Sequence, residues 1–166
     1  MMATTAPFPA LAPDRLERFL GWAALALMAV VLVALARGMA EWNRIPWTIW
    51  AHLVTMIGAL ALTPAILWQR RGDTRHRTLG YVWVALLGTT ALITFAIRTR
   101  PDGHMSLIHL LSAFVLIQLP IIVWSARTHN HVRHRRAIRG MVIGALLVAG
   151  FFTLPFGRLL GRWLFG

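Results

Sequence analysis

Five apolar stretches, separated by short polar connections, dominate the pattern of hydrophobic and polar positions along this chain. A transmembrane helix needs about 20 mainly apolar residues, and backbone amides in hydrocarbon must all be paired within the spanning segment. The stretches meet this requirement, so the pattern predicts an all-α integral membrane bundle of five transmembrane helices. Their expected bounds are 19–36, 48–68, 79–97, 106–124 and 140–156.

The composition agrees with a membrane location. Hydrophobic residues make up 58% of the 166 residues and the mean hydropathy is +0.65, whereas soluble domains are about 45–50% apolar. The sequence holds no cysteine, which excludes disulfides, zinc–thiolate sites and iron–sulfur clusters. We therefore expect one transmembrane domain over residues 18–166, preceded by a loosely ordered Pro/Ala-rich segment over residues 1–17.

Arginine supplies all 17 basic residues, and with only five acids the net charge is +12. The arginines flank the apolar stretches, so the expected partners are the lipid bilayer and its anionic headgroups, and not nucleic acid. Cytoplasmic loops carry the excess of basic residues. Five spans would place eleven arginines on the side of the N-terminus and six on the other side, which predicts a cytoplasmic N-terminus and a C-terminus on the outer side.

The acidic residues fall near the ends of the predicted spans or in the connections, which argues against a proton-coupled transporter built on an intramembrane carboxylate. They are Asp14, Glu17, Glu41, Asp73 and Asp102. The sequence shows no Ser-His-Asp arrangement, no Gly-rich phosphate loop and no zinc-protease motif. The candidate chemistry therefore rests on the histidines.

The same series of residues occurs twice along the chain: a histidine, a proline, a tryptophan, an Arg-His-Arg triplet and a glycine. In the first copy, His52 begins an apolar run that Pro64 interrupts, and Trp68 follows Pro64 by four residues. An Arg-His-Arg triplet centred on His76 then precedes Gly80, and His76 follows His52 by 24 residues. A repeated order of this kind bears directly on the architecture, because each repeat is a structural unit.

The second copy keeps the same order. His109 begins the run, Pro120 interrupts it, and Trp124 follows the proline by four residues. A second Arg-His-Arg triplet, centred on His134, precedes Gly140, and His134 follows His109 by 25 residues. We infer two tandem helix-pair repeats plus an extra N-terminal helix, with the repeats related by a pseudo-twofold axis along the membrane normal.

The repeat places four histidines in two layers. His52 and His109 lie about one turn inside the outer ends of the second and fourth spans, and His76 and His134 lie at the inner ends of the third and fifth. Two imidazoles that face each other across a bundle can ligate both faces of a haem iron. The four histidines are therefore candidate ligands of one or two haem b groups, which would make the protein a transmembrane electron carrier.

Other interpretations fit the same residues. A histidine at a membrane interface is often only a polar anchor, and imidazole also binds zinc or copper. A non-redox membrane protein acting in assembly, regulation or small-solute passage is the alternative from a different class. A redox partner or a second copy of the chain would be compatible with either class. His104, His129 and His131 have no counterpart in the other repeat, so we interpret them as loop residues.

Several of these motifs resemble an uncharacterised family of bacterial multi-pass membrane proteins known by a domain-of-unknown-function label. The matching motifs, within roughly residues 49–161, are His52-Leu53, His76-Arg77 with Gly80-Tyr81, and His134-Arg135-Arg136 with Gly140-Met141. The resemblance implies a membrane location, which for a bacterial protein is expected to be the inner membrane, and implies no established activity. With the arginine count, the C-terminus is then expected in the periplasm.

The histidine pattern is more distantly similar to the ascorbate-reducible transmembrane b-type cytochromes, in which four successive helices each carry one histidine. That similarity implies that His52 pairs with His109 and that His76 pairs with His134, as in an electron-transfer oxidoreductase component. This chain departs from the pattern by its shorter spacings within each repeat and by inner histidines at loop edges. The outer pair is therefore the stronger haem candidate.

Overall fold

The computed structural model describes residues 12–96, 107–155 and 157–166, and within these ranges it contains helices and connections but no β-strand. The prediction of an all-α protein is confirmed. The elements are α1 (Arg15–Arg37), η1 (Met39–Arg44), α2 (Trp47–Trp68), α3 (Thr74–Ala96), α4 (Leu107–Arg127), α5 (His131–Met141), η2 (Val142–Val148), α6 (Ala149–Phe151) and α7 (Leu159–Phe165).

Four helices, α1 to α4, are long and apolar enough to cross a membrane. They contain the first four predicted spans, apart from positions 97 and 106, which lie outside the described residues. Pro64 and Pro120 lie inside α2 and α4 without ending either helix. These helices are those expected of a multi-pass membrane protein.

The fifth apolar stretch belongs to a helical segment that begins and ends earlier than predicted. α5, η2 and α6 follow one another without a loop, and η2 is π-helical. Asn130 caps this segment by accepting the Arg133 N–H at 3.0 Å, which moves its start into the polar residues before Gly140. Because the π-helical turns interrupt the α-helical ladder, none of the three pieces alone has the length of a membrane span.

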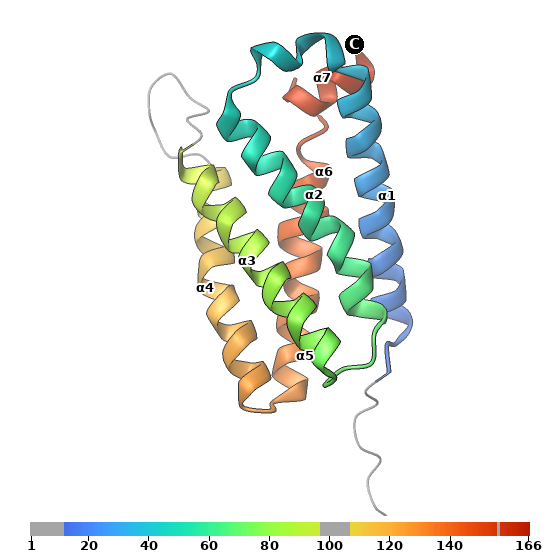
Figure 1. Cartoon of the computed structure of the whole chain (residues 1–166), viewed down its shortest axis with the longest axis vertical. Helices are drawn as coiled ribbons and strands as arrows, with labels where there is room; N and C mark the ends of the chain where they lie inside the picture. The colour runs from blue at the N-terminus through green and yellow to red at the C-terminus, as the bar shows by residue number, and fades with distance from the viewer. Residues whose placement is uncertain (1–11, 97–106, 156) are drawn as a thin grey trace, which may run out of the picture.

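The long helices form a closed ring (Figure 1). α1 packs on α2, α2 on α3, α3 on α4 and α4 on α5, while η2 returns to α1. Apolar side chains from all of these elements meet in the middle. Among them is Trp83, which is only 2% exposed and donates its indole N–H to the Thr63 hydroxyl at 3.0 Å. In this ring α3 lies between α2 and α4, and α4 lies between α3 and α5.

The two ends of the bundle carry different connections. We call the end with the α2–α3 and α4–α5 connections the inner end, and the end with η1 and α7 the outer end (Figure 1). At the outer end, Trp163 of α7 donates its indole N–H to Glu41 at 3.1 Å. A Cβ atom at Gly38 would lie 2.1 Å from the Trp163 ring, so the glycine permits this close approach.

The contact of α1 with α2 near the inner end depends on a glycine. A Cβ atom at Gly21 would lie 2.4 Å from the indole nitrogen of Trp68. We expect Gly21→Ala to destabilise the protein by about 1–3 kcal/mol, because the bulky indole must move. Thermal unfolding in lipid nanodiscs measures the effect. Gly80→Ala is the matched control, since no atom of the described chain comes within 4 Å of its Cβ position; an equal loss in both variants would contradict the packing account.

Candidate functional site

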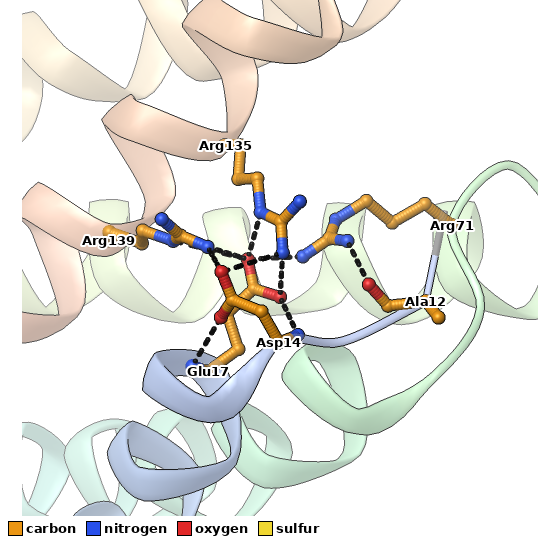
Figure 2. A network of polar contacts seen from close by, with 6 residues as sticks. All are labelled: Ala12, Asp14, Glu17, Arg71, Arg135 and Arg139. Atoms are coloured by element: carbon orange, nitrogen blue, oxygen red, sulfur yellow. Dashed lines mark hydrogen bonds and ion pairs between the residues drawn. The ribbon is translucent and has the colours of Figure 1, made fainter. Parts of the chain in front are cut away.

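A buried carboxylate marks the inner end of the bundle. Glu17, in the first turn of α1, is only 1% exposed. Asp14 precedes this helix and accepts the Glu17 N–H at 3.0 Å, while the Glu17 carboxylate accepts the Asp14 N–H at 3.1 Å. This reciprocal capping box fixes both side chains at the start of the helix. The two carboxylates consequently point to the same place (Figure 2).

Three arginines from two other parts of the chain converge on these acids (Figure 2). Arg135 of α5 donates to the Glu17 carboxylate through Nε at 2.7 Å and through Nη2 at 2.9 Å, a two-pronged geometry that matches a carboxylate. Arg139, one helical turn later, donates to Glu17 at 3.1 and 3.2 Å and also pairs with Asp14. Arg71, from the α2–α3 connection, pairs with Glu17 and donates to the Ala12 carbonyl at 3.3 Å.

The cluster compensates for the burial of Glu17. A buried ion is costly unless it is paired and hydrogen-bonded, and guanidinium groups stay charged in proteins. Burial raises the pKa of Asp14, but the Glu17 N–H and the guanidinium groups of Arg139 and Arg135 lower it by more, so the Asp14 carboxyl stays ionised. The cluster therefore joins α1 to α5 and to the α2–α3 connection.

Sequence reasoning missed this cluster. It assigned the acids to the ends of spans and the arginines to lipid headgroups. Two local signals were present: Asp14-x-x-Glu17 ahead of an apolar run is a capping-box pattern, and Arg135 and Arg139 are spaced to share one helix face. The pairing of α1 with α5 could not be predicted from these signals, because it depends on the closure of the ring.

Two of the predicted site residues meet beside the cluster. A cavity with room for about one water molecule lies between Glu17, Arg71, His76, His134 and Arg135. Apolar side chains form the rest of its wall: Ile66, Leu67 and Ile138. Because His76 comes from α3 and His134 from α5, the structure brings the inner histidines together across the ring.

Local hydrogen bonds near the two inner connections place these histidines. Asp73 accepts the backbone N–H of His76 at 2.6 Å and so holds it in the first turn of α3. The His134 ring donates through Nδ1 to the Ile122 carbonyl at 3.1 Å. That bond leaves Nε2 of His134 as the unprotonated nitrogen. The Nδ1 atom of His76 is buried and has no hydrogen-bond partner within the described part of the chain.

His134 makes the stability of the folded protein depend on pH. Burial lowers its pKa below the ordinary value, the Ile122 carbonyl opposes this, and Arg71 and His131 lower it further. The unfolded chain then binds more protons than the folded chain below about pH 6.5, so stability is complete above this pH and falls as the pH drops. The lowered Asp14 pKa acts in the same direction, but only below about pH 4.

We therefore expect the unfolding temperature to be flat between pH 8 and about 6.5 and to fall toward pH 5. His134→Gln should reduce this slope, because its amide N–H can still donate to Ile122 and does not titrate. Part of the slope should remain, because burial also lowers the pKa of His76 at the same cavity. The matched control is His129→Gln, in the exposed α4–α5 connection, which should keep the wild-type slope. Equal slopes in all three proteins would contradict the assignment.

The outer histidines lie against consecutive residues of α3. Nδ1 of His52 is 3.3 Å from the hydroxyl of Thr94. The His109 ring packs against Phe95 with ring centroids 5.6 Å apart, and His109 is 9% exposed. His52 and His109 thus come from α2 and α4, the two helices that flank α3 on opposite sides.

The other histidines are not part of either pair. His129 and His131 contact each other at the α4–α5 connection, with ring centroids 6.4 Å apart. His104 lies outside the described residues. Within the described part of the chain, no three histidine or acidic side chains come together as a metal site.

The two layers differ in how well they fit a haem. Between His76 and His134 there is room for about one water molecule, and the adjacent arginines are already paired with Glu17 and Asp14, so a haem does not fit the inner layer. At the outer layer, His52 contacts Thr94 through Nδ1, so its Nε2 is the nitrogen that could bind a metal.

No family model, curated protein or solved structure matches this chain. The resemblances noted in the sequence therefore stay predictions. The fold and its polar clusters define a class: a multi-pass helical membrane protein with an ionic cluster at the inner end and a histidine–threonine cluster at the outer end of one bundle.

Proposed function

We propose that this protein binds one haem b between His52 and His109 and carries electrons at the outer side of a bacterial inner membrane. The observation that carries the proposal is the anchoring of His52 through Nδ1, which points Nε2 away from the anchor. Histidines that ligate metals almost always donate their other ring nitrogen to a fixed acceptor. The pairing is supported by the contacts of both histidines with α3, since His52 lies against Thr94 and His109 against Phe95.

The proposed topology has five spans, the fifth beginning near residue 140 and including η2 and α6, so that His134 lies outside it at the inner end. The start of α1 and the end of α7 lie at opposite ends of the bundle, which supports an odd number of crossings (Figure 1). The two repeats are also supported by one matched detail. Pro64 lies inside α2 and Pro120 inside α4, each four residues before a tryptophan.

The proposed orientation places the inner end in the cytoplasm, next to anionic headgroups. Two exposed arginines there lie against aromatic rings at the membrane boundary: Arg127 lies 6.0 Å from the Tyr81 ring centre and Arg133 lies 5.1 Å from that of Trp124. Such pairs suit a headgroup layer. The exposed arginines at this end are Arg15, Arg18, Arg70, Arg75, Arg77, Arg127, Arg133 and Arg136.

In this proposal the bound haem supplies a one-electron redox centre. The imidazoles of His52 and His109 would hold the group, and Thr94 would keep the His52 ring in place. Phe95, packed against His109, restricts the rotation of that ring.

An absorption spectrum of the protein, purified after expression with haem supplied, tests the proposal. We expect a Soret band and the reduced bands of a six-coordinate b-type haem. Absence of these bands would favour the non-redox alternative in assembly, regulation or small-solute passage. Stoichiometric zinc or copper in place of haem would instead indicate a metal-handling protein.

A further inference from the structure

Three threonines tie the helical turn that carries His52 to α3. The Thr90 hydroxyl lies 2.7 Å from the Thr55 hydroxyl, and Thr55 donates to the carbonyls of Ala51 and His52 at 2.9 and 3.0 Å. Thr94 reaches the His52 ring itself. Both the backbone and the ring of His52 are thus fixed by hydroxyl groups between α2 and α3.

The direction of the bond between Thr94 and His52 follows from proton counting. The Thr94 hydroxyl has a single proton and donates it to the Thr90 carbonyl at 2.9 Å. Its oxygen is then an acceptor toward the His52 ring, 3.3 Å away, which favours a proton on Nδ1, and the Thr90 carbonyl is a second acceptor beside this ring. A neutral imidazole with a protonated Nδ1 has its lone pair on Nε2.

We propose that Thr94 is the positioning residue for His52: it selects the tautomer protonated at Nδ1 and aims Nε2 at a ligand. Thr94 is only 6% exposed, so water does not replace its hydroxyl. The inference deepens the proposed function, because it names the group that prepares one of the two proposed haem ligands. The tautomer itself does not depend on haem and is measurable in its absence.

Two substitutions isolate the hydroxyl of Thr94. Thr94→Val keeps the shape and removes the acceptor, whereas Thr94→Ser keeps the acceptor and removes a methyl group. Thr63→Val is the matched control, because Thr63 is another buried threonine of the α2–α3 interface, bonded to Trp83 and not to His52. If Thr94→Val does not fold, Thr94→Ala removes the same acceptor without the branched side chain.

The first measurement is the nitrogen NMR spectrum of haem-free protein with ¹⁵N-labelled histidine in lipid nanodiscs, with the His52 signals assigned from His52→Gln. We expect a protonated Nδ1 and an unprotonated Nε2 in the wild type, in Thr94→Ser and in Thr63→Val. Thr94→Val should lose this preference and show a mixture of tautomers. A wild-type pattern in the valine variant would overturn the inference.

The second measurement is haem retention and midpoint potential in the same set of proteins. We expect Thr94→Val to retain haem about tenfold less tightly and to shift the potential, as loss of an outer-shell partner does at metal sites, with rescue in Thr94→Ser. Unchanged retention and potential in Thr94→Val would overturn the positioning role while leaving the proposed haem in place. A haem-free wild type would refute the proposed function, and the NMR result would still decide the role of Thr94.

Discussion

Replacing Glu17 by glutamine should destabilise the protein by about 3–5 kcal/mol, the cost of removing one partner from a buried ion pair. The substitution keeps the shape of the side chain but leaves Arg71, Arg135 and Arg139 crowded around a neutral amide. Asp14 can compensate only in part, because 44% of its side chain is exposed. Thermal unfolding in nanodiscs should show a midpoint lower by on the order of 10 °C.

Glu41→Gln is the matched control for this prediction. It makes the same chemical change at an exposed glutamate of the outer end, where the amide oxygen can still accept the Trp163 indole N–H. We expect a change within about 0.5 kcal/mol in this control. A Glu17→Gln protein as stable as Glu41→Gln would contradict the view that the cluster holds α1 in the ring.

Removing either outer histidine should abolish haem binding. His52→Ala and His109→Ala each take away one axial ligand, so we expect purified protein without the bands of a six-coordinate b-type haem. His76→Ala and His134→Ala should retain the haem, because the inner cavity has room for about one water molecule. Absorption spectra of the four variants, prepared side by side, provide the comparison.

The opposite result would assign the haem to the inner end. If His76→Ala and His134→Ala lost the haem and the outer variants kept it, α3 and α5 would have to separate enough to admit a macrocycle. The Arg135–Glu17 contacts would then have to rearrange as well. Loss of haem in all four variants would indicate two interdependent sites.

The sequence predicted helices well because the membrane imposes a simple rule. Length and apolarity alone placed the first four spans inside α1 to α4, and the all-α class followed. The fifth helical segment was placed too late because its first turns are polar, so that only the cap at Asn130 indicates its start. Hydropathy does not detect such a cap.

The site was harder to predict, because its residues come from elements that are far apart in the sequence. The recurrence of His76 and His134 indicated that both lie at the inner end, and the structure places them at one cavity. The sequence did not show that Glu17 would be buried there, since that burial requires arginines from a connection and from α5 to arrive at the same point. The threonine contacts of His52 likewise depend on how α2 packs against α3.

The haem content of the purified protein tests the central claim most directly. The protein is expressed with haem supplied and extracted in mild detergent, and its haem b is quantified against the chain by pyridine haemochrome. The account predicts about one haem b per chain, held by His52 of α2 and His109 of α4. A ratio near zero under these conditions would contradict it.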